Sequence, residues 1–141
     1  MIVRSAKGED FDRVLEIDQL SFPTPWDGEF LENISKDIFL VFGGAEVYGF
    51  LIAGCCHRNV TATILKVAVH PQHRRKGIAT NLLNSLLERL RDKKIPEIEV
   101  SVLDGCGPAI ALYKKVGFEI AATIPQGSAN NDIYLMKLKL L

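Results

Sequence analysis

At 141 residues the chain is long enough for one domain with its own core, and a content of 48% hydrophobic and 24% charged residues excludes a disordered chain. Seventeen basic and seventeen acidic residues give a formal net charge of zero, which argues against a dedicated nucleic-acid binder. The longest apolar run, Val47 to Cys56, is too short to cross a bilayer, and the charged N-terminus leaves no room for a signal peptide. The three cysteines lack metal-ligand spacing and suit a reducing compartment. We therefore expect a single cytoplasmic domain over residues 1–141, without a metal.

The first predicted elements are a strand and two helices. Ile2 to Ser5 is typical of a short strand, and the acidic turn after Lys7 predicts a helix that ends at residues 20–21. Phe22-Pro-Thr-Pro-Trp26 cannot continue this helix, because each proline pushes the residue before it toward an extended conformation. Asp27 is a favourable N-cap and predicts a second, short helix.

A hairpin and the central strand follow. Asp37 to Phe42 and Ala45 to Cys56 are predicted strands, joined by Gly43-Gly44, where glycine supplies the positive φ angles of a tight turn. A further turn at His57 to Asn59 leads to Thr63 to Val69, an apolar and β-branched run typical of a buried strand. From Ile78 to Arg91 the apolar residues recur with the spacing of an amphipathic helix.

The last predicted elements are a strand, a helix and two closing strands. Glu97 to Leu103 should run parallel to the central strand, because a helix connects the two. Pro108 fits the first position of a helix that stops at Gly117. Phe118 to Ile124 and Asp132 to Leu140 complete a mixed α/β fold. We expect a mostly antiparallel central sheet of about seven strands, flanked by about four helices.

The joint between the central strand and its helix reads Arg74-Arg75-Lys76-Gly77-Ile78-Ala79. The first amides of a helix lack internal partners and attract anions, and a glycine there lets a phosphate approach the backbone. The pattern therefore indicates a pyrophosphate site, although a solvated turn would have the same composition. Neither G-x-x-x-x-G-K-[ST] nor G-x-G-x-x-G occurs, so a P-loop and a dinucleotide fingerprint are not indicated.

The spacing R-x-x-G-x-A resembles the acyl-CoA-binding motif of the GNAT superfamily of N-acetyltransferases. Ala109-x-x-Leu112-Tyr113-x-x-x-Gly117-Phe118 resembles a second signature of that family, and the likeness covers essentially the whole chain. Within the family, the stretches from Ile17 to Trp26 and from Ile110 to Phe118 look most like the ribosomal-protein-alanine N-acetyltransferases, which modify protein α-amines. The resemblance implies a GNAT fold with a splayed parallel strand pair. It also implies acetyl-CoA as co-substrate and a primary amine as acceptor, most simply a protein N-terminus.

The resemblance also assigns roles by position. It implies that the backbone of Val67, Ala68 and Val69 holds the pantetheine arm and that amides near Val69 stabilise the oxyanion. It implies a pyrophosphate site made of Arg74, Arg75, Lys76, Gly77, Ile78, Ala79 and Thr80. Cys106 stands where the alanine-modifying subgroup has an asparagine that contacts the cofactor.

The candidate aromatic residues have alternative interpretations. Tyr113 matches the general acid of the family, but a tyrosine there would also suit the core with its hydroxyl reaching solvent. Phe22 and Trp26 would line the acceptor side of the cleft, although Trp26 would equally well cap the core.

The general base is where the chain departs from the subgroup, because Ser101 stands at the position of the catalytic glutamate. Glu99 lies two residues earlier on the same side of a strand and is an alternative base acting through water, or else simply a charge at a strand end. Asp18 is a weaker candidate. His57, His70 and His73 fall in turns or at strand ends, where we expect surface side chains.

Three functions stay open at this point. The chain is expected to acetylate a protein or peptide N-terminus, or a small amine such as a polyamine, an amino acid or a drug. The serine at position 101 also leaves room for a non-catalytic acyl-CoA-binding regulatory module. Neither a nucleic acid nor a membrane is an expected partner, and the sequence is compatible with a monomer or a homodimer.

Overall fold

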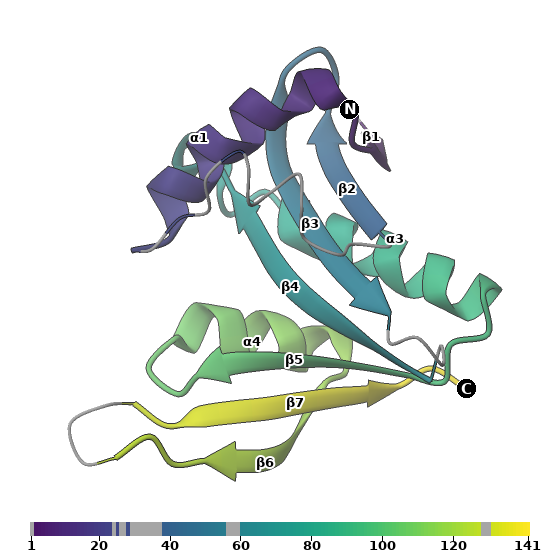
Figure 1. Cartoon of the computed structure of the whole chain (residues 1–141), viewed down its shortest axis with the longest axis vertical. Helices are drawn as coiled ribbons and strands as arrows, with labels where there is room; N and C mark the ends of the chain where they lie inside the picture. The colour runs from purple at the N-terminus through teal and green to yellow at the C-terminus, as the bar shows by residue number, and fades with distance from the viewer. Residues whose placement is uncertain (1, 24, 26–27, 29–37, 56–59, 128–130) are drawn as a thin grey trace. The chain divides into compact units, whose positions relative to one another are not determined.

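The computed structural model describes residues 2–23, 25, 28, 38–55, 60–127 and 131–141 (Figure 1). Seven strands form one sheet with the order β1-β2-β3-β4-β5-β7-β6, accompanied in the described residues by three α-helices. The prediction of a mixed, mostly antiparallel fold is therefore confirmed. Trp26 and the turn predicted at His57 to Asn59 lie outside the described residues, as does the helix predicted from Asp27 except for Gly28.

The elements agree closely with those predicted from the sequence. Each strand boundary is within two residues of its prediction, and the first helix differs in opening with a 3-10 turn. The strands are β1 (Ile2–Ser5), β2 (Ile38–Gly43), β3 (Val47–Cys55), β4 (Thr61–Val69), β5 (Glu97–Leu103), β6 (Glu119–Ile124) and β7 (Ile133–Lys139). The helices are α1 (Phe11–Ser21), α3 (Ile78–Asp92) and α4 (Gly107–Val116), with 3-10 turns η1 (Gly8–Asp10) and η2 (Pro71–His73).

The sheet register confirms the predicted strand directions. β4 and β5 are parallel and pair over Thr61 to Thr63 and Glu97 to Glu99, as expected for strands joined by a helix. The pairs β1–β2, β2–β3, β5–β7 and β6–β7 are antiparallel. In the β2–β3 hairpin only Gly43, and not Gly44, has a positive φ, and a Cβ at Gly43 would collide with the carbonyl oxygen of Glu46. Glycine is thus required at one of the two positions.

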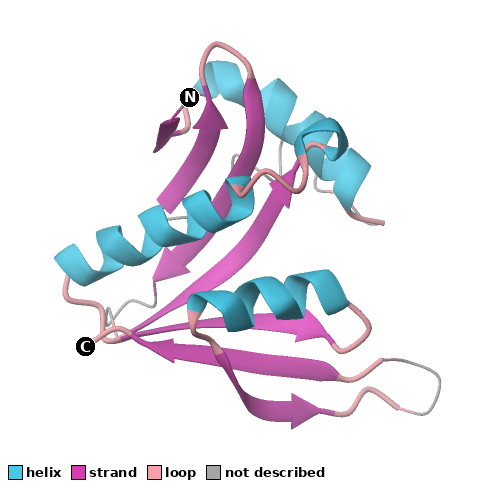
Figure 2. Ribbon diagram, turned by 180° about the vertical axis from the view of Figure 1, so that it is seen from behind, coloured by secondary structure: helices cyan, strands magenta, loops and turns pink. Residues whose placement is uncertain are grey.

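The chain divides into two compact units, of which the first comprises residues 1–54 and 65–86. Helix α1 and the part of α3 that belongs to this unit, residues 78–86, cover opposite faces of strands β2 and β3 (Figures 1 and 2). Val14 and Ile17 are three positions apart and therefore lie on the same face of α1. Both side chains pack into a core with residues of the strands. On the other face Gly49 lets Ile78 and Leu82 of α3 pack close to the backbone of β3. The buried residues of the α1 face are Val14, Ile17, Val41, Val47, Phe50, Ile52 and Ala68.

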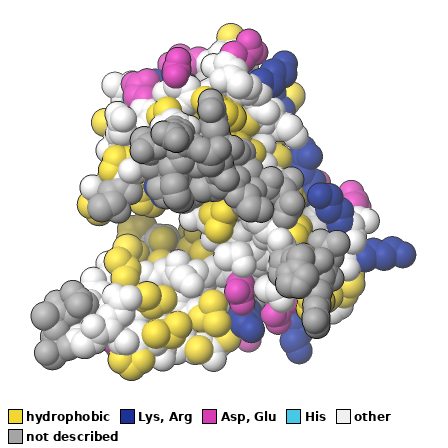
Figure 3. Space-filling view, viewed as in Figure 1, with side chains coloured by type: hydrophobic (Ala, Val, Ile, Leu, Met, Phe, Trp, Pro, Cys, Tyr) yellow, Lys and Arg dark blue, Asp and Glu magenta, His cyan; other side chains and the backbone are white. Residues whose placement is uncertain are grey.

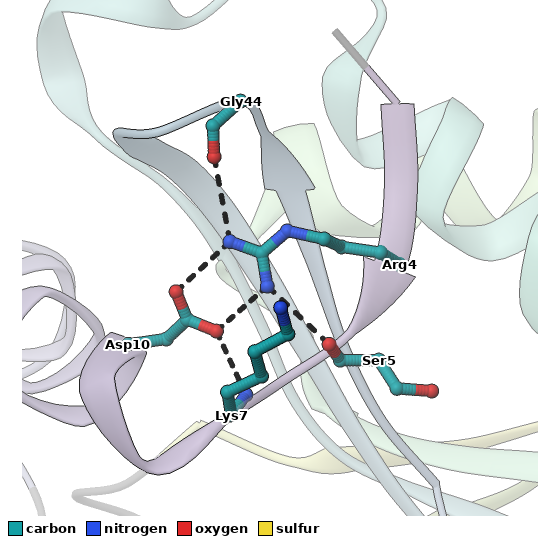
Figure 4. Close-up of polar contacts among 5 residues, drawn as sticks. All are labelled: Arg4, Ser5, Lys7, Asp10 and Gly44. Carbon is teal, nitrogen blue, oxygen red and sulfur yellow. Dashed lines mark hydrogen bonds and ion pairs between the residues drawn. The ribbon is translucent and has the colours of Figure 1, made fainter.

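An ion pair fastens β1 to the start of α1 in this unit (Figure 4). Nη1 and Nη2 of Arg4 donate to the Asp10 carboxylate, at 2.8 and 2.9 Å, and the Lys7 amide donates to the same carboxylate at 2.8 Å. The hydrogen bond from Arg4 lowers the pKa of Asp10 below its ordinary value, against the opposing effect of burial. The acidic first turn predicted from sequence is therefore a structural anchor.

The second unit comprises residues 55–64 and 87–141. Helix α4 covers one face of β5 in this unit (Figure 2), and residues of β5 and β7 opposite one another share a buried face, whereas β6 is exposed along its length. The other face carries the row Leu103, Ile133 and Ile124, and hydrophobic side chains gather over these strands in Figure 3. The buried residues on the α4 side include Ile98, Val100, Val102, Met136 and Tyr113. Within the described residues of the whole chain, every helix falls short of the length and apolar character needed to traverse a bilayer.

Candidate functional site

The joint between β4 and α3 has an unusual backbone. Arg75 and Gly77 both have left-handed φ angles, of 65° and 78°. A left-handed φ at a residue with a side chain, such as Arg75, costs about 1 kcal/mol. It is retained only where the surrounding structure holds the residue in that conformation. Only glycine takes such a φ without penalty, so Gly77 is explained by its conformation. Such local strain is characteristic of ligand-binding turns.

The amides at the start of α3 are available to a ligand. The first backbone hydrogen bond of the helix runs from the Asn81 amide to the Gly77 carbonyl, at 3.0 Å, so the amides of Ile78, Ala79 and Thr80 precede the first closed turn. A Cβ built on Gly77 would meet nothing within 4 Å, which leaves open space over this end of the helix. An anion with several oxygens fits this arrangement of donors, open approach and positive helix end.

The three cations of the turn do not play equivalent parts. Arg74 forms hydrogen bonds within the first unit. Its Nε donates to the Val69 carbonyl at 3.0 Å, and its Nη2 donates to Ser21 Oγ at 3.2 Å. Arg74, Arg75 and Lys76 are all exposed. Arg74 therefore combines an exposed charge with hydrogen bonds to the end of β4 and to α1.

A pocket that the sequence did not indicate adjoins the turn within the first unit. It measures about 350 Å³ and is lined by Phe42, Tyr48, His73, Lys76 and Ile78. The His73 ring stacks on Tyr48, with a centroid separation of 3.7 Å and an interplanar angle of 13°. Desolvation and the nearby Lys76 charge lower the pKa of His73, which favours its neutral imidazole.

The end of β4 leads into the turn through a buried histidine. His70 is only 8% exposed, so the prediction of a surface side chain was wrong at this position. Its amide donates to the Tyr48 carbonyl at 2.8 Å, and its Nδ1 accepts from the Gln72 amide at 3.1 Å, which caps η2. His73 is half-buried, and His57 lies outside the described residues. Of the strand residues assigned to the pantetheine arm, Ala68 and Val69 are buried and Val67 is half-buried.

Tyr113 is the buried phenol of the second unit. It is 5% exposed and packs edge-on against Phe118, with ring centroids 5.5 Å apart. Gly117, at φ 119°, ends α4 and donates to the Tyr113 and Lys114 carbonyls, which brings Phe118 back over the tyrosine. Desolvation raises the pKa of Tyr113 to about 12. The phenol is therefore protonated throughout the physiological pH range.

The remaining predicted residues of this unit lie on β5 and at the start of α4. Glu99 and Ser101 face the same side of β5, as alternation predicted, opposite Lys137 and Leu135 of β7. The Glu99 carboxylate is 28% exposed and lies 3.9 Å from the Lys137 ammonium. Cys106 is the exposed N-cap residue of α4, and its side chain makes no capping hydrogen bond.

The sequence interpretation missed a buried ion pair in the first unit. Lys66 Nζ lies 2.6 Å from Asp18 Oδ1, with the two side chains 10% and 2% exposed, and 4.4 Å from the centroid of the Phe22 ring. The signal was available in part, because Asp18 sits four residues after Val14 on the apolar stripe of α1. A charge on such a stripe indicates a buried partner.

The fold and the turn together define a class of protein. The structure superposes with a TM-score of 0.86 on Ard1 of Thermoplasma volcanium, at 26% identity and with 99% of this chain and 97% of that one covered. It superposes with a TM-score of 0.84 on the ribosomal-protein-S18-alanine N-acetyltransferase of Escherichia coli, at 23% identity, with 98% of this chain and 92% of the other covered. The fold is that of the N-acetyltransferases.

Sequence comparison makes the assignment more specific. The model of the Acetyltransferase (GNAT) family matches residues 11–118, so the chain belongs to that family. An N-alpha-acetyltransferase of Sulfurisphaera tokodaii is 29% identical over 154 aligned positions, which cover 98% of this chain and 92% of the relative. The resemblance inferred from the two motifs is thereby confirmed.

Proposed function

We propose that this protein is a cytoplasmic, acetyl-CoA-dependent N-acetyltransferase whose acceptor is the α-amine of a protein or peptide. The observation that carries the proposal is the turn from Arg74 to Thr80, with its left-handed, exposed Gly77 and its helix amides that precede the first closed turn. The similarity to an N-alpha-acetyltransferase along almost the whole chain supports an α-amine as the acceptor. A GNAT structure of the same fold, NAA60 of Arabidopsis thaliana, was determined in complex with acetyl-CoA, which supports this donor.

The donor would be held largely by main-chain groups. The amides of Ile78, Ala79 and Thr80 are suited to the diphosphate, and the exposed Arg75 and Lys76 add charge attraction. The backbone of Val67 to Val69 would carry the pantetheine arm, and Cys106 would lie beside the cofactor. Recognition by backbone atoms tolerates variation of the side chains in the turn.

Tyr113 would act on the leaving thiolate. A thiol has a pKa of about 8.5, so complete proton transfer from a phenol with a pKa of about 12 to the thiolate costs roughly 5 kcal/mol. We therefore assign Tyr113 the role of a hydrogen-bond donor that stabilises the thiolate as charge develops. Burial makes that role effective, since the phenol stays protonated and meets little competing water.

The acceptor amine needs little help to lose its proton. An α-amine has a pKa of roughly 7.7 to 8.0, so part of it is neutral near pH 7.5. Glu99 is our candidate base, acting through water that reaches its partly exposed carboxylate. Backbone amides near Val69 would stabilise the oxyanion, and Phe22 and Trp26 would line the acceptor side.

A panel of acceptors tests the proposal. Thiol release from acetyl-CoA would be followed with peptides beginning with alanine, serine or other residues, and with polyamines, free amino acids and amine drugs. We expect turnover of α-amino peptides, reduced turnover at neutral pH in Glu99→Gln, and unchanged donor affinity in that variant. Turnover of small amines alone would identify a small-molecule enzyme. Coenzyme A binding without turnover of any amine would identify a regulatory module, which the serine at position 101 makes possible.

A further inference from the structure

Strand β6 has an amino-acid sequence that does not match its surroundings. It reads Glu119-Ile-Ala-Ala-Thr-Ile124, so four of its six residues are apolar and one is charged. A short apolar run of this kind, bounded by glycine and proline, is typical of a strand that is covered on both faces. In the structure all six residues are exposed, including Ile120 at 41% and Ile124 at 46%. The strand therefore lacks the cover that its sequence predicts.

β6 is also the last strand of the sheet (Figure 1). In the described part of the chain it pairs with β7 on one side, and no strand pairs with its other side. The outer N–H and C=O groups of an edge strand form a template on which a further strand can pair. Many natural edge strands are protected by a lysine or a proline within the strand, and β6 contains neither. Its outer side is therefore suited to a further antiparallel strand.

A bulge in β6 determines which of its side chains share a face. The register with β7 shifts by one extra residue after Ile120. Glu119 pairs with Lys137 and Ile124 pairs with Ile133, and these two positions of β7 are four residues apart. Because alternate residues of a strand point to the same face, Glu119 and Ile124 share a face. In a strand without the extra residue they would lie on opposite faces.

This arrangement of faces suits the β6 strand of a second copy of the chain. In a two-fold interface the same surface is used by both copies. Two β6 strands paired antiparallel about their midpoint place Glu119 opposite Ile124 of the other copy, and Ile120 opposite Thr123. Residues opposite one another in such a pair point to the same face, and both pairs meet this condition because of the bulge. The strand is therefore complementary in shape to itself.

Charge also favours a second copy as the partner. Glu119 is the one charged residue of β6, and it lies at the start of the strand. In the two-fold pair the two Glu119 carboxylates lie at opposite ends of the paired strands, roughly 15 Å apart. This separation exceeds the Debye length of about 8 Å at physiological ionic strength, so their repulsion is screened. The formal net charge of zero also leaves no general repulsion between two copies.

We propose that β6 is a self-association surface, on which the antiparallel β6 strand of a second copy joins the two sheets into a two-fold dimer. A standard interface takes roughly 20 to 30 residues from each partner, whereas this strand supplies six. We therefore expect a weak dimer, with a Kd of about 10 μM. β6 belongs to the second unit and the turn from Arg74 to Thr80 to the first, so dimerisation does not depend on donor binding.

Sedimentation velocity of the full chain, from about 1 to about 200 μM, measures an affinity in this range. Ile124→Glu places a carboxylate opposite Glu119 of the other copy. Ile124→Lys is the matched control, because it removes the same side chain from beside Ile133 but places a cation at that position. Ile2→Glu is a second control, because Ile2 is 64% exposed on β1, at the opposite edge of the sheet.

We expect the wild-type protein and Ile2→Glu to dimerise equally. Ile124→Glu should weaken the dimer about thirtyfold, because it removes an apolar contact and creates a like-charge pair at both ends of the symmetric interface. Ile124→Lys should stay within about threefold of the wild-type Kd, because two opposite-charge pairs offset the same loss. Melting temperatures measured at low protein concentration would show that both Ile124 variants are folded.

A wild-type protein that stays monomeric at about 200 μM would overturn the proposal, since a Kd of about 10 μM would make it mostly dimeric there. Oligomers larger than a dimer would also overturn it, because a two-fold pair of β6 strands leaves no open side on either strand. Equal effects of Ile124→Glu and Ile124→Lys, or no effect of either, would show that Glu119 of the other copy does not lie opposite Ile124. Thiol-release turnover tests the proposed function separately, so the two can fail independently.

Discussion

The two units of the molecule bury their polar groups in opposite ways. In the first unit the carboxylates of Asp10 and Asp18 are 5% and 2% exposed and are matched by cations, with Arg4 at 2.8 Å and Lys66 at 2.6 Å. In the second unit Tyr113 is 5% exposed, and burial raises its pKa to about 12. One unit thus buries paired charges, and the other buries a phenol in its neutral form.

The difference distinguishes the paired carboxylates, which stabilise the fold, from the phenol of Tyr113, which is suited to catalysis. A paired carboxylate has its lone pairs and charge occupied, so it stabilises the elements that it joins. A protonated phenol keeps its proton available to a developing negative charge, and removal of water strengthens that interaction. The first unit is therefore sensitive to loss of pairing, and the second to loss of a hydroxyl group.

Tyr113→Phe should have the largest effect, on turnover. It keeps the ring that packs against Phe118 and removes only the hydroxyl, so we expect kcat to fall about 100-fold with coenzyme A affinity within twofold. Thiol-release kinetics and calorimetry measure the two quantities. Tyr48→Phe is the matched control, because it removes a hydroxyl from the first unit and should leave kcat nearly unchanged. Unaltered turnover in Tyr113→Phe would remove this residue from the mechanism.

Asp10→Asn should have the next largest effect, on stability. The variant loses the charge that accepts two hydrogen bonds from Arg4, so we expect about 2 kcal/mol of destabilisation at pH 7, measured by denaturant unfolding. Arg4 lowers the pKa of folded Asp10 below its value of about 3.9 in the unfolded chain. The stabilisation is therefore complete well above pH 4 and is lost as the pH falls through the folded pKa.

The free energy of unfolding at acidic pH distinguishes the Arg4–Asp10 ion pair from a general effect of surface charge. The difference between Asp10→Asn and the wild-type protein should shrink toward zero as the pH falls below the folded pKa of Asp10. Glu9→Gln, at the neighbouring position in η1, is the control and should unfold as the wild-type protein does at every pH. A difference that persists at low pH would show that the aspartate acts through packing.

Local signals allowed most of the fold to be predicted from the sequence. The change from a short apolar, β-branched run in β4 to helical spacing in α3 marks the joint at Gly77, and the glycine there has the left-handed φ that explains its presence. Gly117 ends α4 for the same reason. Each of these signals depends on residues within a few positions of one another, so it can be detected in the sequence without knowledge of the tertiary structure.

The parts that could not be predicted depend on distant partners. Arg74, which was expected to bind the pyrophosphate, also contacts Ser21, and Lys66 pairs with Asp18 from another element. His70 was expected at the surface because it falls at the end of a strand, whereas its ring caps η2 from a buried position. The raised pKa of Tyr113 arises from desolvation, which depends on how closely α4 packs and not on its spacing.

Gly77→Ala should have the smallest of these effects. It tests the open approach to the helix amides at the start of α3, whereas the earlier variants test buried groups. At φ 78° an alanine is strained by about 1 kcal/mol, and its methyl group would enter the open space over the helix amides. We expect coenzyme A affinity to fall about tenfold by calorimetry, with kcat at saturating donor within threefold, because the hydroxyl of Tyr113 is retained. Gly8→Ala is the matched control, since a Cβ there also meets nothing within 4 Å and its φ is not left-handed. Equal donor affinity in Gly77→Ala and Gly8→Ala would show that the diphosphate does not approach the chain at Gly77, and recognition would then have to rest on the exposed side chains of Arg75 and Lys76.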